Sequence, residues 1–163
     1  MTDFINKETF DFDWITGITS ANPEMGQLLG DDIKKFVFGG NATFTVINTN
    51  TKNRFTFKVK QPKNNDSVFF ISVLNGSDNN SNYSFIGTYF TKGGNYRHGK
   101  KSSISSDAQS AKVISWFFSR FIDSEEKYPF VQVYHEGKCG KCGRKLTTPD
   151  SIKNGLGPVC NSR

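Results

Sequence analysis

Ala-Thr-Phe-Thr-Val-Ile-Asn-Thr-Asn-Thr-Lys-Asn-Arg-Phe-Thr-Phe-Lys-Val-Lys, residues 42–60, contains two short runs in which apolar and polar side chains alternate. Alternation with a period of two is typical of a β-strand that buries one face. The polar residues 48–53 lie between the two runs and predict a turn. We therefore predict an antiparallel hairpin at the centre of the fold.

The alternation continues along the chain. Residues 68–74 and 83–90 form two more runs, and the Asn-, Ser-, Gly- and Asp-rich tract between them predicts an exposed loop. Residues 130–133 predict a last short strand. Ser106 or Asp107 is the expected cap of the strongest helix. Its apolar stripe has helical spacing and should cover one sheet face; the stripe consists of Ala111, Ile114, Phe117, Phe118, Phe121 and Ile122.

These segments predict an α+β fold, with an antiparallel sheet of about four to five strands covered by one main amphipathic helix and a small C-terminal zinc module. Residues 1–39 are expected to form an acidic N-terminal segment that docks on the body through aromatic anchors such as Phe10 and Trp14. Residues 40–134 would form the α+β body, and residues 135–163 the zinc-binding module.

The zinc module is predicted from the spacing His135-x3-Cys139-x2-Cys142-x17-Cys160, which holds all three cysteines and one of the two histidines. A Cys-x2-Cys knuckle turns the backbone so that both sulfurs converge on one metal ion. The glycines inside and after the knuckle suit such a turn. A Cys3His set of Cys139, Cys142, Cys160 and His135 is therefore the expected zinc site.

A short helix is predicted between the knuckle and Cys160. Thr148 can cap it, Pro149 suits its first position, and Gly155 would end it. The following glycines and proline would then turn the chain back and deliver Cys160 as the third thiolate.

His98 is the rival of His135 for the position of fourth ligand. Unrelated free cysteines would not have this spacing, and a disulfide framework needs an even number of cysteines. His135-Glu136 resembles the start of the metalloprotease pattern His-Glu-x-x-His, but the second histidine is missing and Gly137 disfavours a helix. Four protein ligands leave no open position, so the zinc is expected to be structural and the protein not to be an enzyme.

The charge of the chain is divided unevenly. Residues 1–33 contain one Lys and seven Asp or Glu, for a net charge of −6, whereas residues 34–163 contain twenty Lys or Arg and eight acids, for +12. The basic body suggests an anionic partner, such as nucleic acid or the acidic surface of a nucleic-acid-binding protein. No apolar run could span a bilayer and the start lacks the basic end of a signal peptide, so we expect a soluble, intracellular protein.

Residues 91–102 are predicted to be the most polar and most basic loop. Arg97, Lys100 and Lys101 beside Tyr96 could bind a phosphate backbone or an acidic protein face, although a basic loop can also be simply solvated. The spacing Gly-x4-Gly-Lys resembles a phosphate loop. However, Lys101 holds the magnesium-binding position and no parallel βαβ unit surrounds it, which excludes nucleotide hydrolysis.

Residues 135–160 resemble the terminal module of a phage and prophage protein family of largely unassigned function. The resemblance covers roughly residues 40–160 and extends to residues 42–45, 54–56, 87, 96–102 and 116–117. It implies a phage-encoded zinc protein in which Cys139, Cys142 and Cys160 ligate the metal and His135 is the natural fourth ligand. It implies no substrate.

The Asn- and Lys-rich chain also resembles zinc-containing anti-CRISPR proteins of streptococcal phage type. That resemblance implies an inhibitor that binds a type II-A RNA-guided CRISPR nuclease in the cytoplasm of the bacterial host. It would block target DNA loading by surface occupation. The expected partner is then the host nuclease, and neither a membrane nor a small-molecule substrate is expected.

The alternative is a phage nucleic-acid-binding zinc module. Its phosphate contacts would come from the loop residues Tyr96, Arg97, Lys100 and Lys101 and the knuckle residues Lys138, Lys141, Arg144 and Lys145. The two hypotheses differ in a measurable property. Direct binding to phosphates loses affinity steeply with added salt, whereas an inhibitor need not bind free nucleic acid.

Overall fold

The computed structural model describes residues 26–75 and 82–157, and within them it contains one antiparallel sheet with the strand order β1-β7-β2-β3-β4-β5-β6. The strands are β1 (Gln27–Leu28), β2 (Asn41–Asn48), β3 (Arg54–Lys60), β4 (Val68–Leu74), β5 (Tyr83–Phe90), β6 (Asn95–His98) and β7 (Val131–His135). The predicted α+β class is confirmed. The sheet has seven strands rather than four or five, because β1 and β6 add to the predicted set.

Strand β6 lies inside the segment predicted to be a loop. It pairs with β5 from Gly87↔His98 to Phe90↔Asn95. Its sequence, Asn-Tyr-Arg-His, has no apolar alternation, and the strand is held by backbone hydrogen bonds at the edge of the sheet. Residues 95–98 are therefore a strand, and only the residues around them form turns.

One continuous helical stretch covers the sheet. It consists of α3 (Gln109–Trp116) and the π-helix η3 (Phe117–Phe121), whose wider turn brings the N–H of Ile122 to the carbonyl of Phe117 at 3.0 Å. The predicted cap at Ser106 or Asp107 is wrong, because the helix starts after Ala108, which has no polar side chain to cap it. The remaining helices are α2 (Asp31–Val37), the short η4 (Glu125–Lys127) and α4 (Pro149–Asn154).

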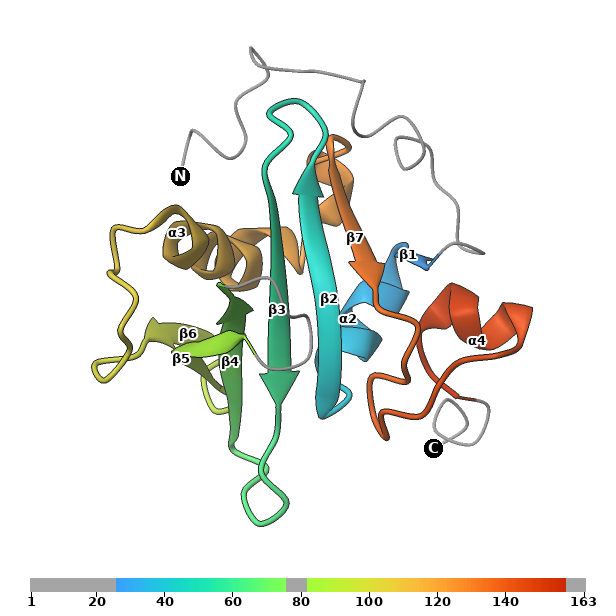
Figure 1. The fold of residues 1–163 in the computed structure, drawn as a ribbon, viewed down its shortest axis with the longest axis horizontal. Helices are drawn as coiled ribbons and strands as arrows, with labels where there is room; N and C mark the ends of the chain where they lie inside the picture. Colours follow the sequence, from blue (N-terminus) through green and yellow to red (C-terminus); the bar gives the residue numbers. More distant parts are fainter. Residues whose placement is uncertain (1–25, 76–81, 158–163) are drawn as a thin grey trace.

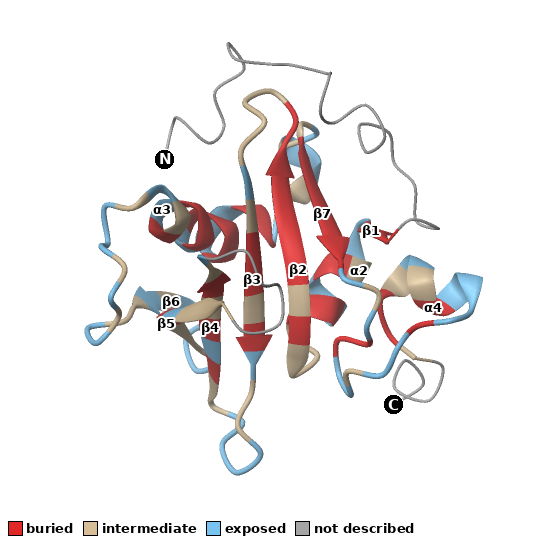
Figure 2. Ribbon diagram, in the orientation of Figure 1, coloured by how far each residue is buried: buried red, intermediate tan, exposed pale blue. Residues whose placement is uncertain are grey.

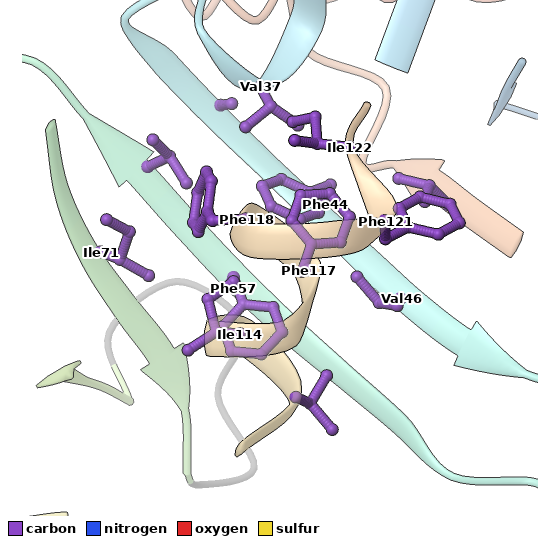
Figure 3. Packing of buried hydrophobic residues seen from close by; sticks show 14 of the residues in the cluster. Val37, Phe44, Val46, Phe57, Ile71, Ile114, Phe117, Phe118, Phe121 and Ile122 are labelled. Carbon is purple, nitrogen blue, oxygen red and sulfur yellow. The ribbon is translucent and has the colours of Figure 1, made fainter. Parts of the chain in front are cut away.

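The main core lies between this helix and the inner face of the sheet. Figure 1 shows α3 and η3 crossing one face of the sheet, and Figure 3 shows their aromatic side chains packed on β2 and β3. Phe117 is fully buried and stacks on Phe44 and Phe121, with ring centroids 5.4 and 5.3 Å away. The predicted helical stripe is therefore a core stripe, as its spacing indicated.

Part of the predicted N-terminal segment belongs to the same architecture. Strand β1 pairs with β7, and Phe36 and Val37 of α2 are buried in the main core. The predicted anchors Phe10 and Trp14 lie outside the described residues. None of the described helices has the length and apolar character needed to cross a membrane.

Candidate metal centre and its basic surroundings

The two neighbouring cysteines lie on a tight hairpin that follows β7. Lys138 and Lys145 form an isolated bridge at its base. Inside it, the N–H of Cys139 donates to the carbonyl of Arg144 at 2.8 Å, and the N–H of Gly143 donates to the carbonyl of Cys139 at 2.9 Å. Gly143 has φ +79°, a conformation that glycine adopts without strain. The spacing therefore produces the predicted turn.

The sulfur of Cys139 is enclosed within this hairpin, and the residue has no exposed surface. Three backbone N–H groups donate to it, from Gly157 at 3.3 Å, Lys141 at 3.4 Å and Cys142 at 3.5 Å. Burial opposes ionisation of this thiol, but the three N–H donors and the side chain of Cys142 outweigh it and lower the pKa of Cys139 to about 7. The hairpin thus favours a thiolate, the form that binds metals.

Helix α4 forms as predicted and returns the chain to the hairpin. The Thr148 hydroxyl accepts from the N–H of Ser151 in a capping box, Pro149 occupies the first turn, and Gly155 ends the helix in the left-handed conformation. The N–H of Gly140 then donates to the carbonyl of Gly155 at 2.9 Å. This bond and the Gly157 donor bring the end of the described chain to Cys139. Cys160 itself lies outside the described residues.

His135 is the last residue of β7, and its ring is held by backbone groups on both sides. Its Nδ1 accepts from the N–H of Gly137 at 2.9 Å, and its Nε2 lies 2.5 Å from the carbonyl of Ile152, to which it donates. Burial lowers the pKa of His135, although the Ile152 carbonyl and the Glu136 carboxylate oppose the shift. The ring is therefore neutral and joins β7 to α4.

Both ring nitrogens of His135 are thus engaged, and a metal bond would require one of them to leave its partner. Within residues 26–75 and 82–157, no three His, Cys, Asp or Glu side chains lie together in a group able to hold a metal ion. The ligand role of His135 stays a prediction. The described geometry brings together Cys139 and Cys142 and places His135 on the strand that leads into their hairpin.

His98, the rival ligand, lies on β6 at the far edge of the sheet. Its Nε2 is 2.8 Å from the carbonyl of Ile104. Five strand spacings of about 4.8 Å separate β6 from β7 in the sheet order. A zinc–ligand bond is only about 2 Å long, so His98 and Cys139 do not reach the same ion.

The predicted basic residues form two separate groups rather than one surface. The first lies on the hairpin and consists of Lys138, Lys141, Arg144 and Lys145, all of which are exposed. The second, Arg97, Lys100 and Lys101, is also exposed but lies on and after β6. Figure 1 shows β6 and the hairpin that follows β7 on opposite sides of the molecule.

Tyr96 does not belong to the second group. Its ring stacks on Phe118, with centroids 5.6 Å apart and planes at 13°. Its hydroxyl is buried without a hydrogen-bond partner among the described atoms, and burial raises the pKa of Tyr96 well above its ordinary value. Tyr96 thus packs against the main core, and its predicted contact with a phosphate or partner stays a prediction.

Two further lysines, Lys58 and Lys60, are absent from the predicted site residues. They line a cleft of about 350 Å³ between the sheet and the hairpin, whose walls are Asn41, Thr43, Lys58, Lys60, Glu136, Lys138 and Gly143. The sequence pattern could have identified these two lysines. Lys58 and Lys60 alternate with the buried Phe57 and Val59, so they must lie on the opposite face of β3.

The comparisons with known proteins concern only this C-terminal region. The family profile described as "Family of unknown function (DUF6011)" matches residues 131–163. No curated protein and no solved structure matches the chain. Strand β7, the cysteine hairpin and α4 are thus similar to a family whose function is not known, and the sheet body has no named relative among these comparisons.

Proposed function

We propose that this protein is a zinc-stabilised nucleic-acid-binding protein, in which Cys139, Cys142 and Cys160 hold a structural zinc ion and the hairpin around them binds phosphates. The observation that carries the proposal is the exposed cationic hairpin. Lys138, Lys141, Arg144 and Lys145 surround the two cysteines, and all four are exposed. With the described acidic residues, none of the four forms a salt bridge.

The donor chemistry supports zinc. Three N–H groups stabilise the thiolate of Cys139, and zinc binds thiolates rather than thiols. Gly157, one of the donors, precedes Cys160 by three residues, a reach of at most about 10 Å along an extended chain. The chain can therefore deliver a third thiolate to the same ion. His135 stays the predicted fourth ligand.

The packing supports a structural role for that zinc. The buried cluster of the module consists of Cys139, Leu146 and Leu156, with Ile152 packed against it. So small an apolar cluster contributes little free energy to folding, and small modules commonly add a metal or a disulfide. Coordination by thiolates would supply the missing stability. No open coordination position is expected, so the ion has no catalytic role here.

Nucleic acid fits the exposed face of the hairpin because phosphates are closely spaced negative charges. Lysine and arginine bind them by releasing condensed counterions, a contribution that does not depend on base sequence. Both arms of the hairpin carry cations, and Lys138 also lines the cleft that contains Lys58 and Lys60. The cationic surface thus extends from the module onto the sheet.

The salt dependence of DNA binding tests this function. For the zinc-loaded protein and labelled DNA, we expect log Kd to vary linearly with the logarithm of the salt concentration. The magnitude of the slope should fall by about 0.9 for each phosphate contact that is removed. The double variant Lys141→Ala, Arg144→Ala should lower that slope by about two. The matched control Lys112→Ala, Lys127→Ala, which removes two exposed lysines elsewhere, should leave it unchanged.

Inhibition of an RNA-guided nuclease stays a prediction, because none of the described contacts bears on a nuclease surface. Adding a guide-loaded nuclease as a second binding partner in this experiment separates the two functions. Binding to a guide-loaded type II-A nuclease, without binding to free DNA or RNA, would overturn the nucleic-acid proposal and favour the inhibitor. Equal salt-dependence slopes for the hairpin variant and its control would show that the hairpin does not contact the nucleic acid.

A further inference from the structure

The face of the sheet opposite α3 carries a second set of residues that the proposed hairpin contacts do not use. Lys58 pairs with Ser72 and Lys60 pairs with Phe70 across β3 and β4, and Phe70 pairs with Thr88 on β5. Paired residues of neighbouring strands project to the same side of a sheet. Since Phe57, Val59 and Ile71 fill the inner core, these partners share the outer face.

Two large aromatic side chains are exposed on that face. Phe70 and Phe85 have exposed fractions of 43% and 37%, and their ring centroids lie 6.3 Å apart with planes at 72°. The strands around them are also more exposed to solvent than the rest of the sheet. Figure 2 shows β2 and β7 mostly buried, whereas β5 and β6 are largely intermediate or exposed.

On the same face, cations lie over two neighbouring rings, those of Tyr83 and Phe90. The Lys58 Nζ lies 4.1 Å from the centroid of the Tyr83 ring, and the guanidinium carbon of Arg97 lies 5.9 Å from the Phe90 ring. Lys60 is exposed and lies directly across from Phe70. Exposed rings and cations therefore alternate over adjacent strands.

The cleft continues this arrangement toward the cysteine hairpin. Lys58, Lys60 and Lys138 contribute three positive charges and Glu136 contributes one negative charge, so its walls are positive overall. The Asn41 amide and the Thr43 hydroxyl add neutral polar groups. A cleft of this composition suits a phosphate group, and Lys60 in its wall pairs with the exposed Phe70 across β3 and β4.

An apolar protein partner would not use the cations, and duplex nucleic acid would not use the rings. Single-stranded nucleic acid uses both, because its unpaired bases stack on aromatic side chains while its backbone follows a positively charged groove. An antiparallel sheet face with exposed aromatic residues is a platform for that purpose.

We propose that the outer face of β3–β6 binds single-stranded nucleic acid, with Phe70 and Phe85 stacking on bases and Lys58, Lys60 and Lys138 contacting the backbone phosphates. This inference rests on the proposed nucleic-acid-binding function and specifies its ligand class. It also extends the binding surface from the cysteine hairpin onto the sheet.

Fluorescence anisotropy with the full-length, zinc-loaded protein tests it. The probes are labelled oligothymidine and oligouridine of about twelve nucleotides and a duplex of the same length. Single strands should bind more tightly than the duplex, and the two single strands show whether DNA or RNA is preferred. The variant Phe70→Leu, Phe85→Leu keeps the apolar character but removes the aromatic faces, and should weaken single-strand binding about tenfold or more.

Matched variants separate stacking from a general loss of structure. Phe70→Tyr, Phe85→Tyr should bind as the unchanged protein does, because tyrosine also stacks on bases. Leu29→Ala, at an exposed apolar residue beside β1, should have no effect. Lys60→Ala should weaken binding and lower the salt dependence, whereas Lys112→Ala should do neither.

The outcomes that would overturn each proposal are distinguishable. If the leucine variant binds single strands as tightly as the unchanged protein, or if the duplex binds equally well, the sheet platform is wrong. If the protein binds duplex and the binding depends only on Lys141 and Arg144, the proposal that the hairpin binds phosphates is retained and the proposal for the sheet face is wrong. If no nucleic acid binds at all, both proposals are wrong.

Discussion

In the sheet body, phenylalanines from the strands, α2 and η3 pack in one continuous core, whereas the buried apolar cluster of the C-terminal module consists, among its described residues, of Cys139, Leu146 and Leu156. The body can therefore fold by burying apolar surface. The module has to be held by other interactions, which are a capped helix, backbone donors to a sulfur and, as we propose, zinc. Adjacent regions of one chain thus obtain their stability from different physical sources.

The two regions meet at an aromatic side chain of the body. A Cβ atom on Gly140 would lie 2.6 Å from Cδ2 of Phe36, and a Cβ atom on Gly155 would lie 2.5 Å from the same atom. The glycine backbone of the module therefore packs directly on the Phe36 ring. Because Phe36 is fully buried in the main core, changes in the body should reach the module, while the reverse effect should be weaker.

The largest expected effect comes from the core of the body. Phe117→Ala should destabilise the whole protein by about 3–5 kcal/mol, because it leaves a cavity between the rings of Phe44 and Phe121. Urea denaturation followed by circular dichroism measures the change. Lys112→Ala, on the exposed side of α3, is the control and should change stability little. A loss below about 1 kcal/mol for Phe117→Ala would contradict a single aromatic core.

The next effect should be confined to the module. Cys139→Ser removes the sulfur that accepts three N–H groups and, as proposed, a zinc ligand. We expect zinc content, measured by native mass spectrometry, to fall from one ion per chain to none. Amide exchange should become fast in residues 138–157 while β2–β5 stay protected. Retained zinc with unchanged protection would show that the hairpin is stable without this sulfur.

The smallest expected effect concerns the bond between β7 and α4. Because burial lowers the pKa of His135 below its ordinary value of 6.5, the folded state binds fewer protons than the unfolded chain near that pH. His135 therefore contributes stability above pH 6.5 that is lost as the pH falls through its lowered pKa. His135→Gln, whose amide can still donate to the Ile152 carbonyl, should reduce this pH dependence.

The same variant sharpens the comparison between backbone bonding and metal ligation. Because His135 is the proposed fourth ligand, we expect His135→Gln to weaken zinc binding, since a neutral amide is a poorer zinc ligand than an imidazole. Thermal unfolding from about pH 7.5 to about pH 5.5 and zinc content are measured on the same samples. Zinc bound as tightly as in the unchanged protein would instead show that the His135 ring only bridges backbone groups.

Much of this architecture could be predicted from local patterns. Strands β2–β5 and β7 have an apolar face, and α4 has Thr148, Pro149 and Gly155 at the expected positions. Strand β6 could not be predicted in this way. It is an edge strand held by backbone pairing, and neither its polar side chains nor its glycine-rich surroundings distinguish it from a loop.

The site is predictable in its spacing but less so in its contacts. The Cys-x2-Cys interval identifies the hairpin, yet the backbone bonds of the His135 ring depend on how α4 packs beside β7, which no spacing reports. The charged neighbours of Tyr96 suggest a basic loop, whereas the pleat of β6 turns its ring toward Phe118. Lys60 could have been found, because the alternation that identifies the core also identifies the residues on the opposite face.

The two edges of the sheet have a consequence for assembly. In the described part of the chain, β1 at one edge has two residues and β6 at the other has four, whereas β2, β3, β4 and β5 have seven or eight. Exposed backbone N–H and C=O groups on a long edge recruit strands from other molecules, and short edge strands prevent this. The sheet is thus a poor template for growth by strand addition. Partners should therefore meet the broad face of the protein rather than extend its sheet.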